Sequence, residues 1–76
     1  MPRLARKQAK VRLNLDMPEK TREQLEGLRE RTDADSLSEV VRRALAVYDF
    51  LWERKAAGSV TIVRSSDGSE TQLQLL

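Results

Sequence analysis

The sequence contains no cysteine and no histidine among its 76 residues. Without cysteine, disulfides and thiolate metal sites are excluded. Without histidine, the commonest general base and metal ligand is missing. No phosphate-binding loop motif is present, and no apolar run approaches the ~20 residues of a membrane span. These absences argue against an enzyme, and we expect no cofactor, no metal site and no membrane partner.

The chain is short enough to form only one small domain. Folded alone, such a chain buries only about 60% of the surface that it exposes when unfolded, which leaves its stability marginal. Small domains are stabilised by disulfides, by metals or by association, and only association remains here. The first ten residues are basic but lack the apolar core of a secretion signal. Together with the absence of cysteine, this leads us to expect a cytoplasmic protein.

Positive charge is concentrated at the start of the chain, although the net charge is only +2. The first twelve residues contain no acid and five bases, which are Arg3, Arg6, Lys7, Lys10 and Arg12. The remaining residues carry nine bases and twelve acids, a net charge of −3. A basic arm on an acidic body points toward a polyanionic partner. We predict that residues 1–10 form a flexible arm, disordered when free, that touches phosphates when bound.

Residues 11–17 alternate between apolar and polar side chains, which is the pattern of a β-strand with one apolar face. Pro18 ends the pattern, because it has no N–H for a strand ladder and suits the first turn of a helix. The only other strand-like sequence is a self-contained hairpin at the far end of the chain. We therefore predict that this strand pairs with its own copy in a second chain, antiparallel across a two-fold axis. The inward side chains would be Leu13 and Leu15, and the outward ones Arg12, Asn14 and Asp16.

Two helices are expected after the strand. Residues 18–32 predict the first helix, with a thin apolar stripe that should lie on a core rather than form one. Asp33 is expected to turn the chain in place of a glycine, because aspartate tolerates left-handed backbone. Ser36 and Glu39 fit the capping box that opens a helix. The second helix is expected over residues 37–57, with Gly58 as the residue that ends it.

The second helix carries a long apolar face and is expected to be the main core helix. We expect Val41, Leu45 and Tyr48 to join Leu13 and Leu15 in a core shared by two chains. The aromatic pair of Tyr48 and Trp52 could form a stacking platform for bases. Packing in a core or an interface is favoured, because both residues continue the apolar face.

Residues 58–76 change period again and are expected to form a β-hairpin. The Asp67-Gly68 pair is the strongest short hairpin signal in the chain. If these two residues form the loop, Ile62 faces Leu73 and Arg64 faces Thr71, which places four apolar side chains on one face. These are Val60, Ile62, Leu73 and Leu75. Because an isolated hairpin is barely stable, this face should rest on the end of the second helix, on a partner's hairpin or on another protein.

The order of strand, helix, capped turn and longer helix resembles the ribbon–helix–helix family of bacterial DNA-binding proteins. The residues that carry the resemblance are the run from Arg12 to Pro18 and the Ser36-Leu37-Ser38-Glu39-Val40-Val41-Arg42-Arg43-Ala44-Leu45 run. It covers residues 11–57. It implies an α+β, mainly α fold: an intertwined ribbon–helix–helix homodimer, here with an added C-terminal β-hairpin. It also implies that the two-stranded ribbon enters the major groove of DNA, and that neighbouring dimers bind together.

The resemblance assigns base reading to the outward strand positions, which here are Arg12, Asn14 and Asp16. Arg12 can bond to guanine and Asn14 to adenine, each pair giving ~1–3 kcal/mol of discrimination. Asp16 departs from the basic or hydroxyl residues of some members. It can accept from cytosine, cap the first helix or hold Arg12. The structural role is favoured, because phosphates would repel a carboxylate.

The start of the second helix is expected to bind phosphate. Its free backbone N–H groups and the positive end of its dipole form an anion site. The residues assigned to phosphate contact are Ser36, Leu37, Ser38 and Arg42 together with Arg3, Arg6, Lys7 and Lys10. Ser36 caps the helix with or without DNA, and Arg42 could equally solvate the helix.

Three functions remain open at this point. The favoured one is a transcriptional regulator, a repressor whose dimers bind double-stranded DNA by sequence and block polymerase sterically. The alternative is an antitoxin, in which the same module binds DNA while residues 58–76 bind and silence a toxin protein. A third possibility, from another class, is a dimerisation module that binds only protein.

Overall fold

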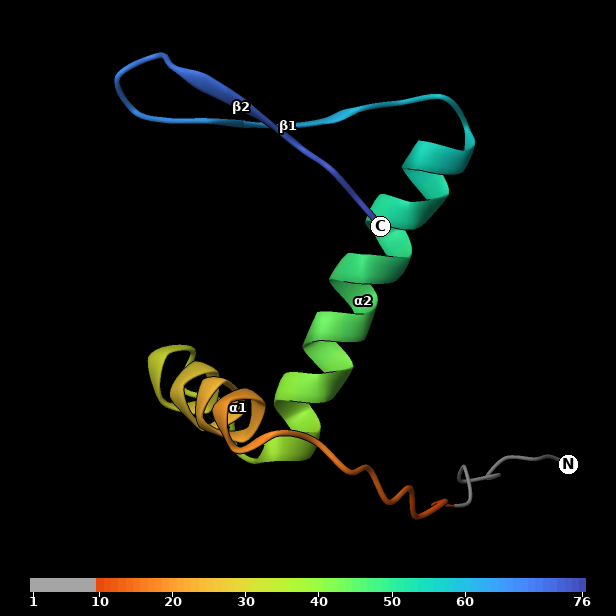
Figure 1. Cartoon of the computed structure of the whole chain (residues 1–76), viewed down its shortest axis with the longest axis vertical. Coiled ribbons are helices and arrows are strands. Elements are labelled where there is room, and N and C mark those ends of the chain that lie inside the picture. The colour runs from red at the N-terminus through yellow and green to blue at the C-terminus, as the bar shows by residue number, and fades with distance from the viewer. Residues whose placement is uncertain (1–9) are drawn as a thin grey trace, which may run out of the picture.

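The computed structural model describes residues 10–76, so the predicted phosphate contacts of Arg3, Arg6 and Lys7 lie outside the described residues. Two helices precede a two-stranded antiparallel sheet (Figure 1). The helices are α1 (Glu19–Arg31) and α2 (Leu37–Ala56), and the strands are β1 (Thr61–Arg64) and β2 (Glu70–Leu73). The fold is therefore α+β and mainly helical, as the sequence predicts.

Helix α1 begins and ends within one residue of its predicted bounds. The Pro18 carbonyl accepts hydrogen bonds from the backbone of Thr21 and Arg22, so the proline opens the helix. At the other end Asp33 has a left-handed φ of 56°. This conformation lets the Ala34 N–H donate to the Arg29 carbonyl at 3.0 Å, which closes the last turn. The prediction that an aspartate replaces the usual glycine is confirmed.

Helix α2 has the predicted signals at both ends. The Ser36 hydroxyl accepts from the Glu39 N–H at 3.1 Å, which is half of the expected capping box. The Glu39 carboxylate binds two arginines of the same helix instead of returning to Ser36. At the C-terminal end Gly58 has φ 95°, and the Ser59 N–H donates to the Arg54 carbonyl at 2.9 Å. The helix ends at Ala56, one residue earlier than predicted, and Gly58 follows the C-cap Ala57 as expected.

The core of the single chain is very small. Helix α1 packs on the first half of α2, where Leu28 and Thr32 line a groove with Val40, Ala44 and Val47. Within residues 10–76 only Ala34 and Val40 are buried hydrophobic residues. The chain exposes 7084 Å², whereas a compact single domain of its mass exposes about 4,700 Å². Its radius of gyration is 16.8 Å, against about 11 Å for a compact chain of this length. Alone, the chain leaves many of its large apolar side chains in water.

Residues 11–17, predicted to be a strand, form no strand in the single chain. Within the part of the chain that the structure describes, their backbone makes no hydrogen bond. The inward residues of the prediction are open to solvent, with Leu13 75% and Leu15 60% exposed. The physical reason is that a strand exists only through its neighbour in a ladder. The hairpin strands pair with each other and leave residues 11–17 without a partner.

The hairpin forms, but its predicted register is wrong by one residue. Ile62 pairs with Gln72, not Leu73, and Arg64 pairs with Glu70, not Thr71. The loop has three residues rather than two. The Ser65 N–H donates to the Ser69 carbonyl, the Gly68 N–H donates to the Ser65 carbonyl, and Gly68 has φ 94°. A three-residue loop of this kind ends in a left-handed glycine bulge.

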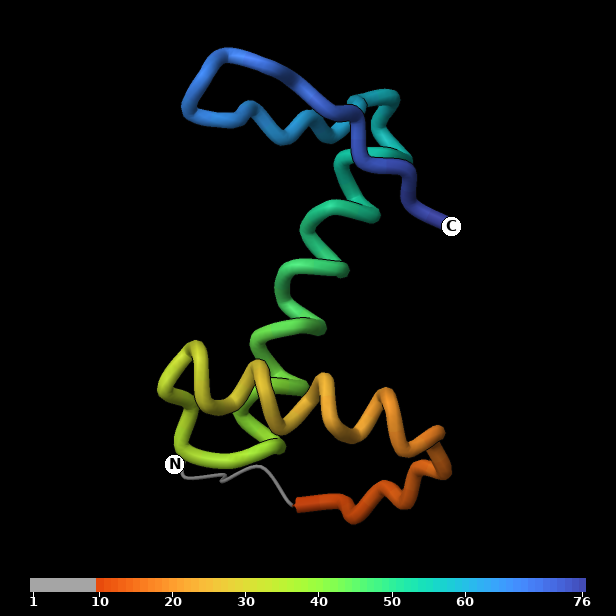
Figure 2. Tube along the Cα trace, turned by 60° about the vertical axis from the view of Figure 1, so that its left-hand side comes forward, coloured from red at the N-terminus to blue at the C-terminus, as the bar shows by residue number. Residues whose placement is uncertain are grey.

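The shifted register changes which side chains share a face. Because side chains alternate along a strand, Ile62 now lies on one face of the hairpin and Leu73 on the other. The predicted single apolar face therefore does not exist. The hairpin lies at one end of the long axis, and residues 10–18 lie at the other end with α1 and the start of α2 (Figures 1 and 2).

Candidate nucleic-acid interface

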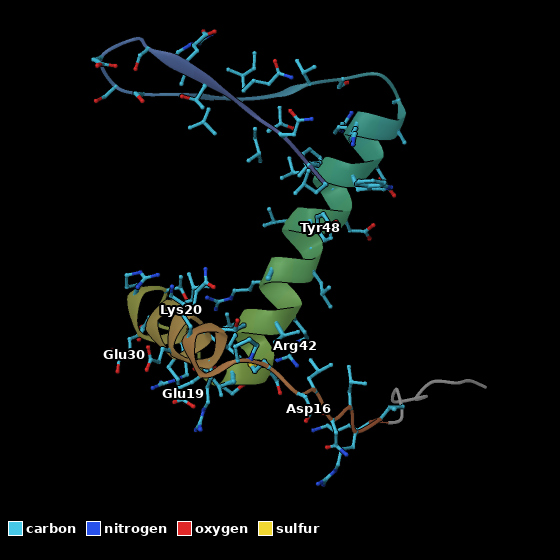
Figure 3. The ribbon with its side chains drawn as sticks, in the orientation of Figure 1. Asp16, Glu19, Lys20, Glu30, Arg42 and Tyr48 are labelled. Atoms are coloured by element: carbon cyan, nitrogen blue, oxygen red, sulfur yellow. The ribbon has the colours of Figure 1, made fainter. Side chains whose placement is uncertain are left out.

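The predicted base-reading residues lie on an open segment. Arg12, Asn14 and Asp16 are all exposed, as is Lys10 just before them. Among residues 10–76 no hydrogen bond of the α1 start involves the Asp16 side chain, so in the single chain Asp16 does not cap this helix. Figure 3 shows Asp16 beside the lower end of the molecule, where Arg42 of α2 also lies. The side chains are available to a ligand, but the single chain does not hold them in a ribbon.

The start of α2 has the features of an anion site. The N–H groups of Leu37 and Ser38 lie in the first turn of the helix, where no intrahelical acceptor exists. Ser36 already accepts the third N–H, from Glu39, so its role as a cap is established in the structure. Ser38 is exposed next to these groups. Two backbone donors and one hydroxyl therefore point out of the positive end of the helix dipole.

An ion-pair cluster follows this site one turn later. Arg42 donates to one oxygen of the Glu39 carboxylate at 2.6 Å, and Arg43 donates to the other at 3.1 Å. The hydrogen bonds from Arg42 and then from Arg43 lower the pKa of Glu39 below its ordinary value. The carboxylate thus stays charged and partly neutralises the Arg42 side chain, which is 66% exposed. A phosphate that binds Arg42 must share it with Glu39 or take it away.

Arg43 has a separate structural role. Its guanidinium also donates to the Thr32 carbonyl at 3.3 Å, at the C-terminal end of α1. A cation at this end satisfies a free carbonyl and the negative end of the helix dipole. This contact ties the two helices together while Arg43 also binds Glu39.

The residues predicted for a shared core form an open face on α2. Val41 is 38% exposed, Leu45 59% and Tyr48 50%. They follow one another at spacings of four and three residues, so they lie on one side of the helix. This side differs from the one that α1 covers, which carries the buried Val40. Nothing within residues 10–76 of a single chain buries them.

Sequence reasoning did not predict a row of aromatic and cation–π contacts at the end of this face. The rings of Tyr48 and Trp52 meet edge to face, with centroids 6.3 Å apart, and the Lys55 ammonium lies 4.8 Å from the centre of the Trp52 ring. Phe50 and Arg54 form a similar cation–π pair at 4.8 Å on another side of α2. The helical spacing of three and four residues was the available signal for each pair.

Two other kinds of site find no support in residues 10–76. No group of three or more acidic side chains there is placed to hold a metal ion. Neither described helix combines the length and the apolar character that crossing a membrane requires.

The comparisons with known proteins add no relative. No protein-family model, no curated protein and no solved structure matches the chain.

Proposed function

We propose that the chain is a transcriptional regulator of the ribbon–helix–helix type, which binds double-stranded DNA as a homodimer and represses by blocking polymerase. The observation that carries the proposal is the unpaired segment of residues 11–17. It alternates in polarity and ends at a helix-starting proline, and its backbone groups have no hydrogen-bond partner among residues 10–76. Such a segment needs a second strand, and a second copy of itself supplies one.

The surface of the single chain supports association. It exceeds that of a compact domain by about 2,300 Å² for one chain and so by about 4,600 Å² for two, and obligate dimers bury about 2,000–5,000 Å² in total. Leu13 and Leu15 together with the open face of α2 offer apolar area of this kind. A paired ribbon would lay the leucines of both chains on these helices and leave Arg12 and Asn14 on the opposite face.

The placement of the polar groups suits DNA. Residues 10–18 and the start of α2 occupy the same end of the molecule (Figures 1 and 2). Outward strand residues can reach base edges in the major groove, while the N–H groups of Leu37 and Ser38 contact a flanking phosphate. We assign Arg12 and Asn14 to base contact and leave Asp16 a supporting role. Arg42 is a weaker candidate for phosphate contact, because Glu39 already binds it.

The hairpin supports the regulator over the antitoxin. It is folded in the chain without a partner, and it contacts the end of α2. An antitoxin's toxin-binding tail would be expected to order only on its target.

The test is selection of bound duplexes from a random DNA library, followed by binding measurements over a range of salt concentrations. The wild-type chain should select a palindrome or a repeat, and its affinity should fall steeply with salt. Arg12→Ala should lose the sequence preference at one position of each half-site. The matched control is Arg64→Ala, which removes the same charge from the hairpin and should preserve the preference.

The outcomes separate the proposals. Sequence preference that survives Arg12→Ala would refute the assignment of the reading face. Absence of any salt-dependent binding to duplex DNA would refute the regulator and leave the module that binds only protein.

A further inference from the structure

Residues 74–76, here called the tail, are fastened to α2. The Lys55 ammonium donates to the Leu75 carbonyl at 3.0 Å, and the Tyr48 hydroxyl donates to a Leu76 oxygen at 3.3 Å. Tyr48 and Lys55 are seven residues apart and therefore lie on the same side of the helix. The tail consequently leaves the hairpin and runs back along α2 toward its middle.

The tail lies beside an open apolar groove. Leu45, Tyr48, Asp49 and Trp52 line this groove. The groove continues the open face of α2 that begins at Val41. Trp52 remains 45% exposed, and Leu76 is 97% exposed although its backbone is fixed. The hairpin thus delivers a leucine to the rim of the groove without burying it.

We propose that a second copy of this chain docks on the groove, and that the tail of each copy forms part of the contact, with Leu76 packing on the partner's α2. This inference rests on the homodimer of the proposed function and extends it beyond residues 11–57. The hairpin then acts as a bracket that positions the tail for dimerisation. It is neither a toxin-binding element nor a DNA contact.

Three observations favour a second copy as the occupant. The groove is continuous with Val41 and Leu45, which the proposed dimer already buries. The excess exposed surface is of the size that an obligate dimer removes. One acid, Asp49, lines the groove and one base, Lys55, lies over the ring of Trp52 beside it, so a copy of the same surface does not meet net charge of its own sign.

The experiment uses the single tryptophan of the chain as its reporter. Trp52 fluorescence is followed while the wild-type protein is diluted from about 100 µM, and sedimentation at both ends of the series gives the mass. The wild type should shift from a buried to a solvated spectrum as dimers dissociate. Leu76→Glu should raise the dimer dissociation constant at least about a hundredfold, because burial of one leucine contributes about tenfold or more and each dimer buries two. The matched control is Ser66→Glu, which adds the same charge on the hairpin loop and should leave the constant unchanged.

Because Leu76 is exposed in the single chain, its replacement cannot unfold that chain. Helix content by circular dichroism at high concentration should accordingly match the wild type. If the wild type is a dimer and Leu76→Glu raises its dissociation constant no more than Ser66→Glu does, the role of the tail is overturned and the proposed regulator is unaffected. A wild-type chain that sediments as a folded monomer throughout would overturn both.

Discussion

The substitution Leu15→Ala distinguishes a protein that folds as a single chain from one that folds only as a paired dimer. In the single chain Leu15 is 60% exposed and belongs to no helix or strand. Substitution of such a residue changes stability by about 0.5 kcal/mol or less. In the proposed ribbon the same leucine lies between the strands and the α2 helices of both copies. There its truncation should cost about 2–5 kcal/mol for each copy, hence about 4–10 kcal/mol for each dimer.

This cost is comparable to the whole stability of a small domain, which is about 5–15 kcal/mol. The assay is urea unfolding followed by far-ultraviolet circular dichroism at two protein concentrations a hundredfold apart. For the wild type the midpoint should rise with concentration, because folding and association are coupled. For Leu15→Ala the midpoint should fall sharply or the chain should be unfolded in buffer.

The matched control is Asn14→Ala on the same segment. The alternation places Asn14 on the outward face, so its replacement should leave the midpoint unchanged while weakening DNA recognition. Equal midpoints for Leu15→Ala and the wild type, independent of concentration, would refute the paired ribbon and with it the proposed reading of DNA.

Three further predictions concern the arm, the helix cap and the ion-pair cluster. Deletion of residues 1–9 should weaken binding to all duplexes while sequence preference is retained. The slope of log affinity against log salt should fall by up to ~0.9 for each phosphate that the arm neutralises. An unchanged slope would mean that the arm does not touch phosphates. Ser36→Ala should destabilise the protein by about 1 kcal/mol, seen as a melting temperature about 4–8 °C lower, whereas Ser38→Ala should have little effect. Because the pKa of Glu39 is lowered, its pairing with Arg42 and Arg43 stabilises the fold fully at pH values above the ordinary glutamate pKa of about 4. This contribution disappears as the pH falls through the lowered pKa. Glu39→Gln should therefore flatten the acid side of the stability profile, and an unchanged profile would contradict the pairing.

The helices were predictable because their signals are local. Pro18 opens α1, Asp33 closes it, Ser36 opens α2 and Gly58 follows its end, and each acts through hydrogen bonds that span three to five residues. No distant contact is needed to place such boundaries. The predicted bounds consequently differ from the structure by no more than one residue.

The hairpin shows where local signals are insufficient. Asp67-Gly68 suits a two-residue loop and also the last two positions of a three-residue loop, and the two differ by one residue in register. In the structure the Asp67 carboxylate accepts from the Ser69 N–H at 3.0 Å and from its hydroxyl at 2.7 Å, which fixes the longer loop. The same bonds lower the pKa of Asp67. Because side chains alternate, the shift of one residue moved Leu73 to the face opposite Ile62.

The sequence by itself determined the two helices, their caps, the existence of a hairpin and the polarity of residues 11–17, because each depends on neighbours along the chain. Only the tertiary structure decided that α1 buries Val40 but leaves Leu45 and Tyr48 open, and that Lys55 and Tyr48 hold the tail. These outcomes depend on how elements cross in space, and no spacing along the chain encodes a crossing. The pairing of residues 11–17 depends on a second copy, so neither the sequence nor a single chain contains it.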